Sequence, residues 1–192
     1  MKKVLGVVFV FAVLICVTPN LNAKESPNFA ISINPFATLI PLILGGIGVE
    51  GSLEFAISPS IGIFIPVEYL SLSSWGWTYS YVSFGAEGRY YFAYFDLEKT
   101  DFKFGDSRAL SGLWGGAGVN LQFWTIGTWR DTVITIPIKA GYKFVFGEKS
   151  GFFLEPYLGF KIGFGFSNWT GASYNRPSYS GFIYGVGLGY AF

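Results

Sequence analysis

Residues 181–192 read GFIYGVGLGYAF, and neighbouring positions in this stretch differ sharply in size. One set of alternate positions is large and apolar or aromatic: Phe182, Tyr184, Val186, Leu188, Tyr190 and Phe192. The other set is mostly glycine and alanine. A repeat of two residues predicts a β-strand, because successive side chains of a strand point to opposite faces. Neither face carries a charge, whereas a strand with one face in water would carry some.

The composition indicates a surface that is not built only for water. The 192 residues fit one domain. Half of them (51%) are hydrophobic and 13% are charged, compared with about 25% charged residues in an ordinary domain. After the amino terminus, no run reaches the roughly 20 apolar residues of a membrane helix. The remaining options are a large dry core or a β-barrel in lipid.

The amino terminus has the pattern of an export signal. Two lysines precede an apolar run at Val4–Val17, and Ala23 offers a small residue before a cleavage site. We therefore expect residues 1–23 to be a cleaved signal peptide and residues 24–192 to form one outer-membrane barrel. The alternative is a membrane anchor that the mature protein retains.

Residue types that are rare or missing exclude several kinds of chemistry. The chain has no histidine, and its one cysteine, Cys16, lies in the expected signal peptide. We therefore expect no disulfide, no metal site and no cofactor. The net charge of +1 gives no basic patch for nucleic acid.

The alternation seen in residues 181–192 recurs along the chain. We expect an all-β fold, an eight-stranded antiparallel up-and-down transmembrane barrel, because strands of about ten residues suit a tilted membrane crossing. The expected strands cover residues 29–38, 47–57, 61–69, 82–92, 113–124, 134–146, 152–166 and 181–192. The segment 39–46 is interpreted as an apolar turn around Pro41.

The connections suggest an orientation. Short turns at 58–60 and 147–151 are assigned to the periplasm, and longer loops at 71–79, 125–132 and 167–180 to the outside. The charged segment 93–110 is expected to be a long periplasmic connection with strand ends inside it. Six tyrosines lie near strand ends or on the lipid side, and some of them are expected to form interfacial girdles; the six are Tyr79, Tyr81, Tyr90, Tyr142, Tyr184 and Tyr190.

Three prolines conflict with this pattern. Pro66, Pro137 and Pro156 lie inside expected strands. A proline cannot donate a backbone hydrogen bond, and a closed barrel has no edge where the missing donor is harmless. We expect β-bulges or strand ends at these positions.

The charges of the strands decide which face points inward. In each strand, the bulky apolar residues occupy one set of alternate positions, the apolar phase. Every charged strand residue lies in the other set, the polar phase. The interior of an eight-stranded barrel is too narrow for all of the bulky apolar side chains. We therefore expect the apolar phase to face lipid and the polar phase to face the lumen. Buried charges need partners, so this phase should form a polar network. Its expected members are Glu50, Glu54, Glu68, Glu87, Arg89, Asn120, Gln122, Lys139, Lys143, Glu155 and Lys161.

A plugged lumen predicts a non-enzymatic barrel with a structural or surface-interaction role. The alternative is a narrow channel for small solutes, although eight strands leave little continuous space.

These features resemble the small bacterial outer-membrane barrels of the OmpA transmembrane-domain and OmpX-like superfamily, over about residues 28–192. The resemblance rests on the signal segment, the alternating strands, the polar interior and the final Tyr190-Ala191-Phe192. It implies a porin-like monomer in the outer membrane of a Gram-negative-type envelope, in contact with its lipid. It also implies that periplasmic chaperones and the barrel-assembly machinery handle the chain. The assembly signal would be Tyr184, Leu188, Tyr190 and Phe192. Some relatives of this size are enzymes that act on lipid through a histidine, which this chain lacks, so the resemblance implies a third hypothesis, a lipid-modifying outer-membrane enzyme that works without histidine.

Overall fold

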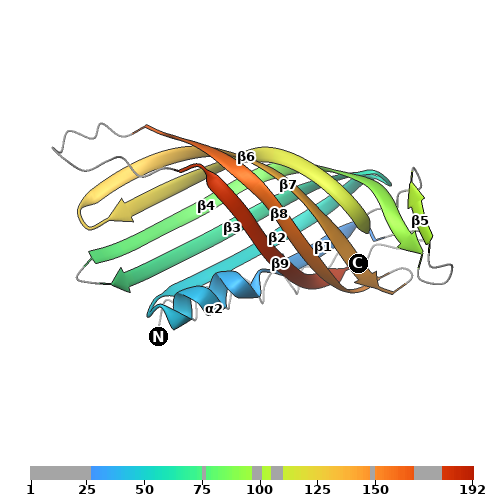
Figure 1. Cartoon of the computed structure of the whole chain (residues 1–192), viewed down its shortest axis with the longest axis horizontal. Helices are drawn as coiled ribbons and strands as arrows, with labels where there is room; N and C mark the ends of the chain where they lie inside the picture. The colour runs from blue at the N-terminus through green and yellow to red at the C-terminus, as the bar shows by residue number, and fades with distance from the viewer. Residues whose placement is uncertain (1–26, 75–76, 97–100, 105–109, 148–149, 167–178) are drawn as a thin grey trace.

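The structure is a computed structural model that describes residues 27–74, 77–96, 101–104, 110–147, 150–166 and 179–192. The expected signal peptide, residues 1–23, lies outside the described residues. Eight antiparallel strands close into an up-and-down barrel, which confirms the predicted fold class (Figure 1). The barrel strands are β1 (Phe29–Ile33), β2 (Ile47–Ser58), β3 (Ile61–Ser74), β4 (Trp77–Asp96), β6 (Gly112–Ile126), β7 (Trp129–Phe146), β8 (Gly151–Gly165) and β9 (Gly181–Ala191).

The two ends of the described chain close the barrel. Strand β9 pairs with β8 on one side and with β1 on the other, and β3 pairs with β4. The Phe192 N–H donates to the Phe29 carbonyl at 2.7 Å, and the Asn28 N–H donates to the Phe192 carbonyl at 2.8 Å. These bonds continue the β1–β9 ladder and remove an exposed sheet edge there.

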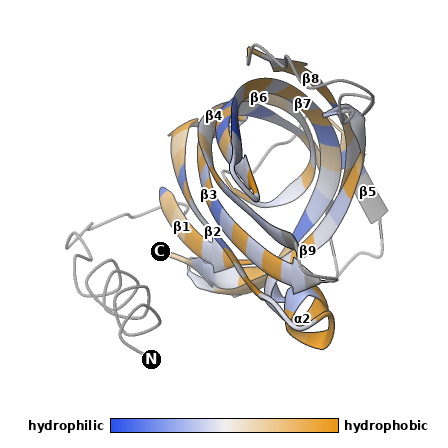
Figure 2. Cartoon of the chain, turned by 90° about the vertical axis from the view of Figure 1, so that its left-hand side faces the viewer, coloured by the Kyte–Doolittle hydropathy of each residue, from blue (hydrophilic) through white to orange (hydrophobic). Residues whose placement is uncertain are grey.

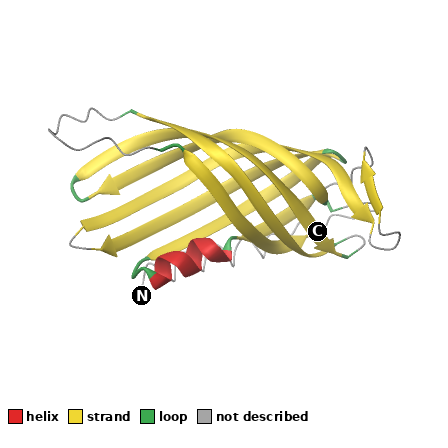
Figure 3. Ribbon diagram, viewed as in Figure 1, coloured by secondary structure: helices red, strands yellow, loops and turns green. Residues whose placement is uncertain are grey.

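The segment after β1 differs from the prediction. Strand β1 ends at Ile33, and Pro35–Ile43 form a helix, α2, where we predicted a strand end and an apolar turn (Figure 3). The Asn34 side chain accepts a hydrogen bond from the Phe36 N–H at 3.1 Å and so caps the helix. Pro35 occupies the first helical turn, where its missing N–H costs nothing. Gly45, with φ of +78°, ends the helix in the left-handed region.

Helix α2 lies beside the barrel wall where β1 is too short to fill it. It contacts β2, β9 and β3, and Figure 2 shows it at the side of the ring of strands, coloured as hydrophobic. Gly48 of β2 permits the close approach, since an added Cβ would lie 2.6 Å from the Pro41 ring. The side of the helix away from the barrel is apolar, and Ile43 is 81% exposed. None of the described helices is both long and apolar enough to cross a membrane.

Several predicted connections are strands instead. Residues 71–74 continue β3 and residues 77–79 belong to β4, paired as far as Ser74 with Trp77. Similarly, β6 and β7 are joined by Gly127 and Thr128 alone. The predicted loops 71–79 and 125–132 were therefore wrong, because polar and aromatic residues there still pair across strands. The predicted loop 167–180 lies largely outside the described residues.

The charged segment 93–110 is partly strand. Strand β4 extends to Asp96, and β5 (Asp101–Phe104) pairs antiparallel with its last four residues. This hairpin projects at the end of the barrel opposite α2 (Figure 1). The prediction of strand ends inside this connection is confirmed, whereas residues 97–100 and 105–109 lie outside the described part.

The three strand prolines are accommodated without the predicted bulges or strand ends. At Pro66 the β3–β4 pairing keeps one register and skips only Ile65 and the proline. The β6–β7 pairing skips Pro137 and the β7–β8 pairing skips Pro156 in the same way. On its other side each proline keeps a register partner. A missing N–H therefore interrupts one ladder locally and leaves the strand in place.

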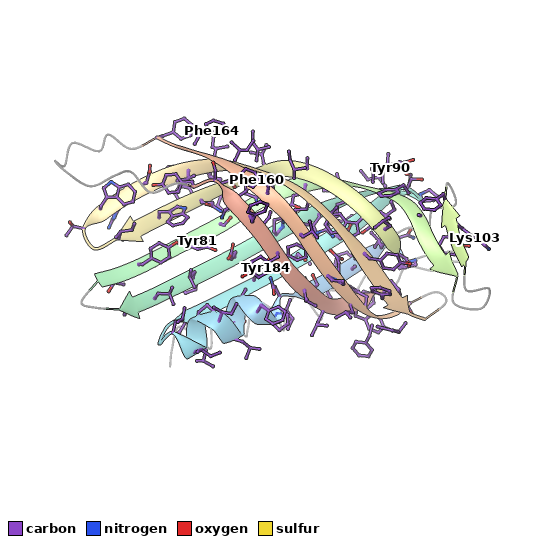
Figure 4. All side chains as sticks on the ribbon, viewed as in Figure 1. Tyr81, Tyr90, Lys103, Phe160, Phe164 and Tyr184 are labelled. Atoms are coloured by element: carbon purple, nitrogen blue, oxygen red, sulfur yellow. The ribbon has the colours of Figure 1, made fainter. Side chains whose placement is uncertain are left out.

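The two faces of the barrel differ in polarity. Outward side chains are apolar and exposed along every long strand, with Phe182 at 86% and Leu158 at 70%. Tyr90, Phe160 and Phe164, labelled in Figure 4, belong to this outer set. Inward positions hold the buried charged and polar side chains.

Candidate functional site

Four charged side chains from four strands meet in the barrel interior and form what we call the ion-pair ring: Glu54 of β2, Arg89 of β4, Lys143 of β7 and Glu155 of β8. Arg89 Nη1 lies 3.1 Å from Glu54 Oε2 and 2.7 Å from Glu155 Oε1. Lys143 Nζ lies 2.9 Å from Glu155 Oε2 and also pairs with Glu54. Acids and bases alternate, so the charges of the ring cancel. Each of the four side chains is at most 5% exposed.

Aromatic side chains pack around the ion-pair ring. The Arg89 guanidinium carbon lies 3.4 Å from the Phe64 ring centroid and 4.0 Å from that of Trp114, a cation–π arrangement. Lys143 Nζ lies 4.7 Å from the Phe153 centroid. Trp114 and Phe153 are buried, and they fill the narrow cross-section of an eight-stranded barrel. This level of the lumen is packed like a protein core.

A second ion pair lies next to the ring, on the side of α2. Lys139 Nζ is 2.7 Å from Glu87 Oε1, and the side chains are 9% and 0% exposed. Lys139 also lies 5.4 Å from the Tyr157 ring centroid. This pair separates the packed half of the lumen from an open half.

The open half holds a cavity of about 310 Å³, which we call the chamber. Its polar lining includes Asn34, Glu50, Glu68, Tyr81, Ser83, Asn120, Gln122, Lys139, Tyr157 and Lys161. Its apolar lining includes Phe36, Ala37, Ile40, Pro41, Leu70, Phe182, Ile183 and Tyr184, from α2, β3 and β9. The volume is at the lower end of the roughly 300–1,000 Å³ typical of small-molecule sites.

The two acids of the chamber, Glu50 and Glu68, each accept a hydrogen bond from an uncharged side chain. Asn34 Nδ2 donates to Glu50 Oε2 at 2.7 Å and lies 3.1 Å from the Tyr157 hydroxyl. Tyr81 donates its hydroxyl proton to Glu68. Glu50 and Glu68 are directly opposed across β2 and β3. Among the described residues, neither acid forms an ion pair within 4.0 Å.

An aromatic group extends from Tyr81, which lines the chamber. Tyr81 stacks on Trp124 with ring centroids 4.9 Å apart, and Trp124 meets Tyr179 edge-on at 5.2 Å. The Tyr179 hydroxyl donates to Asp131 Oδ2 at 2.6 Å. Tyr81 was one of six tyrosines from which girdle residues were expected; it is not one, because it alternates with Val82 and points inward, where it is 8% exposed.

The structure sorts the predicted interior residues into distinct groups. It brings Glu54, Arg89, Lys143 and Glu155 together and pairs Glu87 with Lys139. The remaining members line the chamber without joining that network: Glu50, Glu68, Asn120, Gln122 and Lys161. Gln122 accepts a hydrogen bond from Trp124 Nε1 at 3.0 Å, and Lys161 forms no hydrogen bond or ion pair with any described residue.

Two kinds of uncharged side chain complete these groups. Tyr91 donates to Glu54 at 2.6 Å inside the packed half, and sequence reasoning missed this role. Asn34 and Tyr157 support Glu50 in the chamber; their approach to the glycines of the last strand was expected from the sequence, but their contact with Glu50 was not. The alternation of side chains along each strand could have indicated these tyrosines, because Tyr91 lies on the same strand face as Arg89, and Tyr157 on the same face as Glu155. Gly185 of β9 leaves room for the Tyr157 side chain, since a Cβ added at Gly185 would lie 2.5 Å from the Tyr157 hydroxyl.

The predicted assembly residues lie along the outer face of β9. Tyr184 and Leu188 are exposed there, and Figure 4 labels Tyr184 on this strand. The Tyr190 ring lies 5.2 Å from Phe152 and 4.7 Å from Phe192, measured between centroids. These contacts tie β9 to the barrel, and recognition by an assembly machinery stays a prediction.

Comparison of this chain with protein-family models, with curated proteins and with solved structures found no match. In the described part of the chain, no three or more Asp, Glu, His or Cys side chains cluster closely enough to hold a metal ion. The site is therefore interpreted from its own geometry. That geometry is a closed barrel with buried ion pairs in one half and a polar chamber in the other.

Proposed function

We propose that this chain is an outer-membrane β-barrel of the OmpA transmembrane-domain and OmpX-like kind, whose lumen is closed by the ion-pair ring and does not conduct. The observation that carries the proposal is the opposite polarity of the two barrel faces. Monomeric soluble proteins rarely expose continuous apolar patches larger than a few hundred Å². Here, apolar side chains are exposed on all of the long barrel strands and on α2. A lipid environment satisfies such a surface.

The charged interior supports the same proposal. In a soluble barrel, the polar phase would face water and the apolar phase would fill the inside. Here the charged groups are inside, and those of the packed half are paired: Arg89 and Lys143 with Glu54 and Glu155, and Lys139 with Glu87. Paired charges avoid most of the cost of burial and fix a single arrangement of strands.

The role that we propose is structural and non-enzymatic. The barrel is a monomer that is exported by its signal peptide, handled by periplasmic chaperones and inserted by the barrel-assembly machinery. Contacts with other molecules at the cell surface would be made by segments outside the barrel wall. We assign the end with the short β2–β3 turn, the start of β1 and the carboxyl terminus to the periplasm, so α2 and the chamber face the outer leaflet.

The experiment that tests closure is conductance in a planar lipid bilayer. Refolded protein is first checked on gels, where a closed barrel migrates differently before and after boiling. We expect folded protein to produce no current steps, because the ion-pair ring and the rings of Phe64, Trp114 and Phe153 fill the lumen. Steady current steps from folded protein would instead support the channel alternative.

A further inference from the structure

The wall of the barrel is incomplete next to α2. Strand β9 pairs with β1 only from Leu188 to Ala191, so within the described residues the stretch 181–187 has no β1 partner. Helix α2 lies along this interval and contacts both β2 and β9. The barrel wall is therefore held there by side-chain packing and lacks a continuous backbone ladder.

The chamber reaches the outer surface through this interval. Its lining includes the inward Ile183 together with the outward Phe182 and Tyr184 of β9. Since Phe182 and Tyr184 are among the most exposed side chains of the protein, the cavity passes around the free edge of β9. Phe36 and Ile40 of α2 line the same cavity, so the passage is apolar.

The charges inside the chamber are not balanced by one another. Glu50 and Glu68 lie directly opposite across two strands, a placement that is destabilising for like charges. Lys161, from β8, lines the same cavity as both acids but forms no ion pair with a described residue. In the described part of the chain, the chamber thus offers two carboxylates and one ammonium group that form no ion pair within 4.0 Å.

We propose that the chamber binds the headgroup of a zwitterionic, amine-bearing phospholipid, with the acyl chains leaving between α2 and β9. The primary ammonium of the headgroup lies between Glu50 and Glu68, where it relieves their repulsion. The phosphate faces Lys161. The hydrocarbon follows Phe36, Ile40, Phe182 and Tyr184 into the surrounding lipid. This inference rests on the proposed membrane placement of the barrel.

The charge arrangement favours this ligand over simpler ones. A lone anion would meet two carboxylates, and a lone cation would leave Lys161 unmatched. A metal ion lacks ligands, because no group of three acidic residues exists in the described part of the chain. A zwitterion matches all three groups, and charge-assisted hydrogen bonds are about twice as strong as neutral ones.

The test is lipid binding by native mass spectrometry of the full folded protein in a maltoside detergent. Three probes are compared: lysophosphatidylethanolamine, lysophosphatidylglycerol with the same acyl chain, and free phosphoethanolamine. We expect the ethanolamine lipid to bind about tenfold more tightly than the glycerol lipid. We expect free phosphoethanolamine to bind more weakly than either lipid, because it lacks the acyl chain.

Variants locate the site. The double variant Glu50→Gln and Glu68→Gln should lose the preference for the ethanolamine lipid, and Lys161→Met should weaken binding of both lipids. Lys103→Met removes the same charge from β5, away from the chamber, and should bind as the unmodified protein does. Gel mobility before and after boiling verifies folding of each variant. If the double variant fails to fold, the inference is tested by the headgroup preference of the unmodified protein and by the binding of both lipids to Lys161→Met.

Three results would overturn the inference. Equal binding of the two lipids would show that the acids do not recognise an amine. Free phosphoethanolamine that binds as tightly as its lipid would exclude a lateral passage for the chain. A preference that persists in the double variant would place the site elsewhere. Any of these results, obtained with protein that is folded, would overturn the lipid site and leave the barrel proposal intact. Protein whose gel mobility does not change on boiling would count against the barrel proposal itself.

Discussion

Replacing Glu54 by leucine should destabilise the barrel strongly. Glu54 accepts from Arg89, Lys143 and Tyr91, and all of these groups are buried. Without the carboxylate, the ion-pair ring carries one acid and two bases. The excess positive charge has no route to water, because Phe64 and Trp114 pack directly on Arg89.

The size of the effect follows from the geometry. Arg89 and Glu54 are 3.1 Å apart, and two unit charges at that distance attract by about 5 kcal/mol at an effective dielectric constant of about 20. The cost of burying the carboxylate offsets part of this attraction. Removing one partner from a buried pair therefore lowers the free energy of unfolding by about 3–5 kcal/mol.

The assay is a double-mutant cycle on Glu54 and Lys143. Glu54→Leu, Lys143→Met and the combined variant are unfolded with guanidinium chloride, followed by tryptophan fluorescence and gel mobility. The combined variant keeps the Arg89–Glu155 pair and restores neutrality, so we expect it to lose less free energy of unfolding than the two single variants lose together, by a coupling energy of about 2–3 kcal/mol. If Glu54→Leu costs less than about 1 kcal/mol, the value typical of solvated ion pairs, the sealed ring is wrong.

Three further perturbations test other parts of the structure. Glu87→Leu should cost less than Glu54→Leu, about 1–3 kcal/mol, because Lys139 borders the chamber and can reach water; an equal or larger loss of unfolding free energy would refute this ranking. Gly48→Val should lower stability by about 1–3 kcal/mol through overpacking against Pro41, whereas the control Gly115→Val, with nothing within 4 Å of its added Cβ, should be close to neutral. Phe192→Ala removes ring contacts to Tyr190 and Phe29 and should reduce the amount of protein in the outer-membrane fraction; normal assembly would exclude Phe192 from the signal.

The strands and their inner faces could be predicted because the underlying signal is local. An alternation of two residues fixes which side chains share a face, so Glu54 and Arg89 could be assigned inward from their own strands. Their pairing could not be predicted. It depends on the tilt and stagger of β2, β4, β7 and β8 around the closed barrel, which no single strand encodes.

Helix α2 could not be found by periodicity. Residues 35–43 are apolar on nearly every side, so no amphipathic repeat separates a helix from a turn. The usable signal was Asn34 followed by Pro35, a capping residue before a first-turn proline. We instead interpreted Pro41 as a turn residue. The chamber was missed for the same reason, since its side opening exists only because β1 is short and α2 lies beside it.

The most direct test of the account is the position of Leu158 relative to lipid. Leu158 lies at the middle of β8 and is 70% exposed. The only cysteine of the chain lies in the expected signal peptide, so Leu158→Cys in the mature protein can carry a single environment-sensitive fluorophore. In vesicles, we expect lipids brominated near the ends of their acyl chains to quench this fluorophore strongly and to leave a label at the turn residue Ser150 unaffected. Water-like emission from the Leu158 position, unquenched by these lipids in folded protein, would contradict the membrane barrel.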